Sequence, residues 1–191
     1  MYVPTHFAVA DQADMLALIA AHPLGALVRM GRDDLEADHI PFSLVQPSGI
    51  APHGVLQAHV ARSNPLWRAD GAPVLVLFQG ASSYVSPQLY DLEAAGGRAV
   101  PTWNYTVVHA HGRLHAIEDP AWILAQMERL TRRHEDAHAG WKVEDAPRDY
   151  IDKLVRATVG IEIVIERLEA KFKMSQNRTP EDRARVLAAM G

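Results

Sequence analysis

The alternation of apolar and polar side chains predicts several β-strands, and the clearest of them covers residues 105–117. Successive side chains of a strand point to opposite faces of its sheet. Here the even positions are small or apolar, whereas the odd positions include His109, His111, Arg113 and His115. A strand buried in a core has no need of such a face, so we expect this one to line a site or a subunit contact.

Shorter patterns of the same kind predict the other strands. A continuous apolar run at residues 74–78 is typical of a strand that is buried on both faces. Pro41 lacks an amide hydrogen and therefore favours a sheet edge or a bulge. The expected strands cover residues 26–30, 39–45, 54–62, 74–80 continuing at 83–86, and 159–166.

Capping residues followed by apolar residues at helical spacing predict helices between the strands. Asp11, Asp119 and Thr179 can each accept from the first free amides of a helix, and Pro120 fits a first helical position. The expected helices follow Asp11 as far as His22, and then cover residues 65–69, 89–94, 120–133, 147–157 and 179–190.

About seven strands joined by short turns and helices indicate a mainly β protein, with an antiparallel sheet closed or nearly closed into a β-barrel and flanking helices. We expect one domain over residues 1–191, with a C-terminal helical extension at about 179–190. No glycine-rich nucleotide fingerprint follows any predicted strand, which argues against a doubly wound nucleotide fold.

Composition narrows the classes of function. The 191 residues include no cysteine, which excludes disulfides, thiolate catalysis and thiolate metal sites, and fits a reducing cytoplasm. The formal net charge of −4 argues against direct DNA binding. No signal peptide and no apolar run long enough for a membrane span is evident, so we predict a cytoplasmic protein without membrane contact.

Three interpretations of the histidine strand stay open. His109 and His111 would lie about 6.6–7 Å apart along one face. Imidazoles bind transition metals, but a metal site needs three or four convergent ligands, and the other histidine-rich place, His134 and His138, falls in a helix end or loop. We therefore predict no metal site and favour a polar face against solvent or a partner, with a ligand or flavin contact and metal ligation as alternatives.

Two segments have the chemistry of an anion site. In the first, His59 and Ala61 precede Arg62, Ser63 and Asn64 where a strand meets a short helix, so amides, a hydroxyl and a guanidinium could hold a phosphate. A plain helix cap beside a surface arginine is the alternative. In the second, Lys171, Lys173, Ser175, Gln176 and Arg178 precede a helix, and a solvated basic loop is the alternative.

A third segment, Trp103-Asn104-Tyr105, could stack on a planar ligand and hydrogen-bond to it, although aromatic core packing would explain it as well. Nucleophilic catalysis has little support, because no serine lies in a nucleophile elbow.

Taken in their order along the chain, the motifs at residues 59–64, 103–105 and 171–178 and several shorter segments resemble one family. It is the FMN-binding negative transcriptional regulator family of the PaiB type, within the pyridoxamine-phosphate-oxidase-like flavin split barrels. One departure is Ser63, where the family pattern has alanine, and a serine hydroxyl can also donate to a phosphate. The matching segments are residues 1–7 (MYVPTHF), 39–42 (HIPF), 58–65 (AHVARSNP), 76–80 (VLFQG), 84–87 (YVSP) with Tyr90, 100–105 (VPTWNY), 108–112 (VHAHG) and 171–178 (KFKMSQNR).

The resemblance implies a six-stranded Greek-key split barrel that forms a homodimer, with FMN at the subunit interface. It implies that residues 59–64 hold the phosphate and ribityl chain, and that Trp103, Asn104 and residues 173–176 approach the flavin. A flavin-binding transcriptional regulator is the first hypothesis that follows. The alternatives are an FMN-dependent oxidoreductase or flavin reductase, and a barrel that has lost its flavin and serves as a binding module.

Overall fold

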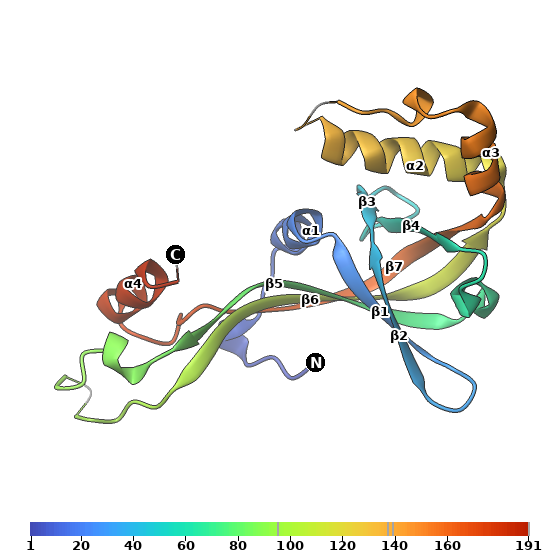
Figure 1. The fold of residues 1–191 in the computed structure, drawn as a ribbon. Helices are drawn as coiled ribbons and strands as arrows, with labels where there is room; N and C mark the ends of the chain where they lie inside the picture. The colour runs from blue at the N-terminus through green and yellow to red at the C-terminus, as the bar shows by residue number, and fades with distance from the viewer. Residues whose placement is uncertain (95, 137, 139, 191) are drawn as a thin grey trace. The chain divides into compact units, whose positions relative to one another are not determined.

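A computed structural model describes residues 1–94, 96–136, 138 and 140–190. Within these residues, seven strands form one sheet in the order β2-β1-β5-β6-β7-β4-β3 (Figure 1). The strands are β1 (Leu24–Met30), β2 (Leu35–Pro41), β3 (Ser43–Val45), β4 (Val55–Ala61), β5 (Pro73–Val85), β6 (Thr102–Ile117) and β7 (Thr158–Lys173). The longer helices are α1 (Gln12–Ala21), α2 (Pro120–Glu135), α3 (Arg148–Arg156) and α4 (Pro180–Ala188). Short 3₁₀ helices are η1 (Thr5–Phe7), η2 (Pro65–Ala69), η3 (Pro87–Leu89) and η4 (Val143–Asp145).

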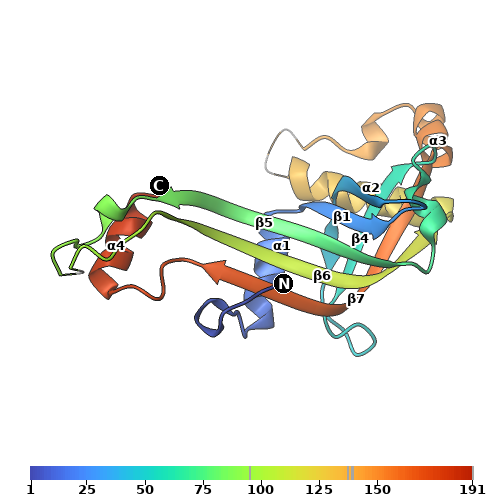
Figure 2. The ribbon, with the colours of Figure 1, turned by 90° about the horizontal axis from the view of Figure 1, so that it is seen from below.

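The chain divides into two compact units, which share the three long strands β5, β6 and β7. Unit 1 contains residues 1–22, 77–109 and the chain from Leu168 onward, and unit 2 contains residues 23–76 and 110–167. The three long strands are neighbours in the sheet (Figure 2).

In unit 2, β4 has two different faces because its side chains alternate. Leu56, Ala58 and Val60 are buried on one face, while Gln57 and His59 belong to the other. β4 pairs antiparallel with β7, and this register places His59 opposite Gly160. The helices α2 and α3 share a small apolar core that includes Ile123.

In unit 1, a second apolar cluster joins the end of β5 to α4. Val85, Tyr90 and Val186 are buried together, and the guanidinium carbon of Arg178 lies 4.4 Å from the centroid of the Tyr90 ring. Thr179 caps α4 by accepting from the Asp182 amide. These contacts therefore hold the C-terminal helix α4 in a defined position within unit 1.

Several local predictions are confirmed. Asp11 and Asp119 cap α1 and α2, Asn64 caps η2, and the mainly antiparallel sheet with flanking helices has about the predicted number of strands. The six strands implied by the resemblance become seven because the three-residue strand β3 also pairs, with β4. Among the described residues, no helix is both long enough and apolar enough to cross a membrane.

One prediction of local structure is wrong, and one segment with two open interpretations begins as strand. The expected helix at residues 89–94 is replaced by η3 and a turn, in which the Asp91 carboxylate accepts from the Ala94 amide at 3.0 Å. Such a side-chain bond competes with helix formation. The basic segment from Lys171, for which an anion site and a solvated loop were the alternatives, begins as strand, since β7 continues to Lys173 and Lys171 bridges to Ala8.

Candidate functional site

A groove with a volume of about 530 Å³ lies where β4 leads into η2 in unit 2. Ser63 and Asn64 line it together with Arg29, Glu36 and Asp38, and we call it the Ser63 groove. Asn64 has two local partners, because its amide nitrogen donates to Asp38 at 2.8 Å and its oxygen accepts from the Leu66 amide at 2.8 Å. Asn64 therefore fixes one wall of the groove and caps η2 itself.

Arg29 is the unusual residue of the Ser63 groove. It stands opposite Glu36 in the β1–β2 register and forms an ion pair with it. The Arg29 side chain is 10% exposed, and its Nε has no hydrogen-bond partner among the described residues. Buried donors are almost always paired, so this donor indicates a missing hydrogen-bond acceptor.

Charge indicates what the Ser63 groove can bind. Its two carboxylates, Glu36 and Asp38, outnumber its one cation, Arg29. The Ser63 hydroxyl and Arg29 Nε add donors to these acceptors. This mixture suits a ligand with several hydroxyl groups, which both donate and accept, better than it suits a bare dianion.

Arg62 lies next to the groove in sequence and is held by protein groups. Its guanidinium pairs with Glu118 at 2.5 Å and donates to the carbonyl oxygens of Arg156 at 3.1 Å and Thr158 at 3.3 Å. The side chain remains 39% exposed. A phosphate at Arg62 must therefore compete with Glu118.

The two remaining predicted residues of unit 2 lie on β4. Ala61 is exposed and pairs with Thr158 of β7. His59 is half-buried, and its Nδ1 lies 2.7 Å from the Oε1 atom of Gln126 on α2. The predicted site residues of unit 2 all lie at the end of β4 and in the turn that follows it. They are His59, Ala61, Arg62, Ser63 and Asn64.

The other predicted site residues lie in unit 1, where Lys173 organises the start of β6. Its ammonium donates to the Thr102 hydroxyl at 2.5 Å and to the Trp103 carbonyl. Burial lowers the pKa of Lys173, and the positive charges of Lys171 and Arg178 lower this pKa further. An anion bound beside Lys173 would relieve this repulsion.

Asn104 and Ser175 form a buried pair in unit 1. The Asn104 amide nitrogen donates to Ser175 Oγ at 3.0 Å, and the hydroxyl lies 3.2 Å from the amide oxygen. Ser175 adopts a left-handed backbone with φ of 58°. Gln176 accepts from the Met174 amide at 2.6 Å and donates to the Phe172 carbonyl. These side chains stabilise the turn that leads from β7 towards α4.

Trp103 is open to solvent. It is 55% exposed and makes an edge-to-face contact with Tyr84, with ring centroids 6.0 Å apart. The interpretation as buried aromatic core is therefore wrong for Trp103, because alternation along β6 turns Asn104 inward and Trp103 outward. An exposed aromatic face of this kind can stack on a planar ring.

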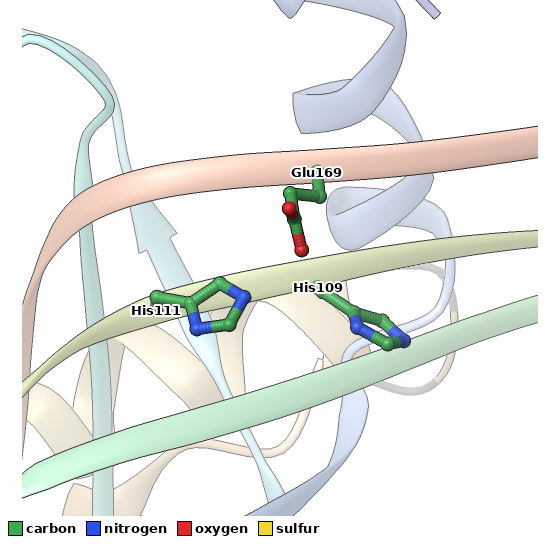
Figure 3. Close-up of side chains that lie close together, drawn as sticks. All are labelled: His109, His111 and Glu169. Carbon is green, nitrogen blue, oxygen red and sulfur yellow. The ribbon is translucent and has the colours of Figure 1, made fainter. Parts of the chain in front are cut away.

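The histidine face of β6 gains an acidic neighbour. Figure 3 shows His109 and His111 on β6 and Glu169 on β7, and one potential ligand atom of each lies within 4.8 Å of the others. Glu169 also accepts from the Met1 ammonium at 3.2 Å. Farther along β6, His115 Nδ1 lies 3.8 Å from an Asp70 carboxylate oxygen.

Sequence reasoning missed several of these neighbours. Arg29 and Glu36 could have been found, because Gly31 to Asp34 have the composition of a hairpin turn, which places the two residues opposite each other. Gln126, Glu118 and Glu169 gave no such signal, because each reaches its partner across a large separation in sequence.

The mainly antiparallel sheet with its flanking helices is the arrangement of a split β-barrel. The family described as "Putative FMN-binding domain" matches residues 1–167. The chain belongs to this family, and FMN is its cofactor.

Individual relatives agree with this membership. An uncharacterized protein of Emericella nidulans is 33% identical over 98% of this chain and 89% of its own length. "Protease synthase and sporulation protein PAI 2" of Bacillus subtilis is 29% identical over 98% of this chain and 87% of its own. The structure of the FAD and heme binding protein from Mycobacterium smegmatis has a TM-score of 0.65 at 19% identity, over 96% of this chain and 80% of that one, which shows the shared fold.

The residues of the Ser63 groove fit such a cofactor. Arg29 Nε is a buried donor that finds no partner within the residues the structure describes, and Ser63, Glu36 and Asp38 can bind the hydroxyl groups of a ribityl chain. When bound, FMN supplies the redox chemistry, while the protein supplies binding and orientation.

Proposed function

We propose that this chain is an FMN-binding homodimer with a regulatory role, and that FMN lies at the subunit interface. In this proposal, the ribityl chain and phosphate follow residues 59–64, and Trp103, Asn104, Lys173, Ser175 and Gln176 approach the flavin ring. The observation that carries the cofactor site is the buried Nε of Arg29 in the Ser63 groove, which has no hydrogen-bond partner in the described part of the chain. The regulatory role rests on the family resemblance given above, and the Bacillus subtilis relative is named for protease synthesis and sporulation.

Identifying the molecule that co-purifies with the protein tests the proposal. Yellow protein that releases FMN on denaturation, and a mass of two chains by light scattering, are the expected results. Colourless protein that takes up no added FMN would sink the cofactor assignment. The net charge of −4 favours regulation through a partner over direct DNA contact, so we expect no band shift with promoter DNA at moderate salt.

An FMN-dependent oxidoreductase is the second candidate. The exposed edge-to-face pair of Trp103 and Tyr84 favours it, because such a surface can hold a second planar molecule. Rapid anaerobic bleaching of the bound flavin by NADH or NADPH would support this function, and a flavin that stays oxidised would support the regulator.

Arg62→Ala should weaken FMN binding roughly 10- to 150-fold, the equivalent of about 1.5–3 kcal/mol for a charge-assisted hydrogen bond. Glu118→Gln should instead strengthen binding, because it removes the charge that competes for the guanidinium. Fluorescence titration of FMN measures both effects. Arg32→Ala, at an exposed arginine in the β1–β2 turn, is the matched control. Equal affinities for the Arg62 and Arg32 variants would defeat the phosphate assignment.

A further inference from the structure

Two side chains of α2, one helical turn apart, contact a cross-strand pair of β4 and β7 and so position the helix over these strands. Gly160 stands opposite His59, and the ring of Trp122 fills the space that a side chain at Gly160 would occupy. Gln126 follows Trp122 by one turn of α2, so it faces the same way. Its Oε1 reaches to 2.7 Å from His59 Nδ1. The helix thereby brings an amide directly onto the imidazole.

A second contact stops α2 from sliding along the sheet. Arg129 donates to the Gln57 oxygen at 2.9 Å, and the Gln57 amide nitrogen donates to Glu162 at 2.8 Å. Gln57 and Glu162 are themselves a cross-strand pair. Two contacts one turn apart therefore fix the height of Gln126 above His59.

The chemistry of the pair determines which imidazole nitrogen is protonated. Gln126 is completely buried, and its Nε2 has no partner among the described residues. Its amide oxygen faces His59 Nδ1, and an amide oxygen can only accept. Neutral His59 must then carry its proton on Nδ1, which leaves Nε2 as an acceptor.

We propose that Gln126 is a positioning residue that holds His59 in the Nδ1–H form, so that His59 Nε2 accepts a hydrogen bond from a ribityl hydroxyl of FMN. The proposal rests on the proposed function, in which the ribityl chain follows residues 59–64. A phosphate dianion offers acceptors alone, and an accepting Nε2 cannot bond to it. The contact therefore belongs to the hydroxyl-bearing part of the cofactor.

The protonation of His59 can be measured without any flavin. In protein labelled with ¹⁵N-histidine, long-range proton–nitrogen correlations distinguish the two neutral forms, and the His59→Gln spectrum assigns the signal. We expect Nδ1 to be protonated in the wild type, and the proton to move largely to Nε2 in Gln126→Met. A wild-type His59 protonated on Nε2 would mean that the amide has the opposite orientation, and would overturn the proposal.

The affinities of three flavins then show which part of FMN contacts His59. Gln126→Met should weaken FMN and riboflavin by the same factor, about three- to tenfold for one neutral hydrogen bond. It should leave lumiflavin, which lacks the ribityl chain, unaffected. Exposed Gln46→Met should change none of the three affinities. A loss confined to FMN would assign the contact to the phosphate and contradict the proposal.

The results separate this inference from the function on which it rests. If the wild type binds no flavin, the proposed function fails and the ribityl contact fails with it, whatever the tautomer. If the wild type binds FMN and Gln126→Met binds it equally well, the positioning role alone fails. The methionine also removes from the interior the Gln126 Nε2 donor, which has no partner in the part of the chain that the structure describes, so we expect the variant to fold.

Discussion

Replacing Gly160 with alanine is expected to lower the free energy of unfolding by about 2 kcal/mol, as overpacking of a filled site commonly does. An added Cβ would lie 2.4 Å from Cζ3 of Trp122 and 3.2 Å from the Ile117 carbonyl oxygen. Both the α2 side and the strand side of the site are therefore occupied. Urea unfolding followed by circular dichroism measures the loss.

Gly49→Ala is the matched control, because a Cβ there would meet nothing within 4 Å and no positive φ is involved. It should be neutral or slightly stabilising, since alanine restricts the unfolded chain. Combining Gly160→Ala with Trp122→Leu should cost less than the sum of the two single changes if the clash is with the indole ring. A Gly160→Ala protein as stable as the Gly49→Ala protein would contradict this account of how α2 is held.

Ser175→Ala is expected to lower the free energy of unfolding by about 1–3 kcal/mol, because it leaves the buried amide of Asn104 without its principal partner. The nearest alternative acceptor for this amide, Met190 Sδ, is 3.6 Å away, and sulfur is a weak acceptor. Serine and alanine both carry a β-carbon, so the positive φ at residue 175 strains both about equally. The difference between them therefore reports the hydroxyl.

Ser83→Ala supplies the comparison for this change. Ser83 is half-buried, and its hydroxyl donates to the Tyr84 carbonyl at 3.3 Å in a solvent-exposed contact, so its loss should alter stability by less than about 0.5 kcal/mol. Chemical unfolding of both variants under the same conditions gives the contrast. Two indistinguishable midpoints would show that the Asn104–Ser175 pair contributes little, and would leave its conformation to be explained by packing alone.

Much of the local structure was predictable because its causes lie within a few residues. A cap such as Asp119 satisfies amides that follow it directly, and alternation along β6 depends on the geometry of one strand. The failed helix at residues 89–94 marks the limit of this reasoning. There the Asp91 side chain accepts a hydrogen bond from the backbone of a turn. Composition alone did not show whether the helix or this turn would be the more stable.

The candidate site was predictable as a set of residue types and much less as a set of contacts. The order of the motifs indicated a flavin-binding chain, and the segment from His59 to Asn64 does stay together at one end of β4. The sequence did not indicate that Glu118 would hold Arg62 or that Gln126 would hold His59. Those partners depend on how α2 and its flanking residues pack against the sheet.

By itself, the sequence determined the strands, most helix caps, the family and the cofactor, because periodicity, capping and motif order are properties of neighbouring residues. The tertiary structure alone decided which donors and acceptors are already satisfied within the protein. It left Arg29 Nε without a partner among the residues that are described, paired the Arg62 guanidinium with Glu118, and turned Trp103 towards solvent. The physical reason is that satisfaction and burial depend on atoms from distant segments, and these meet once the sheet and its helices have packed.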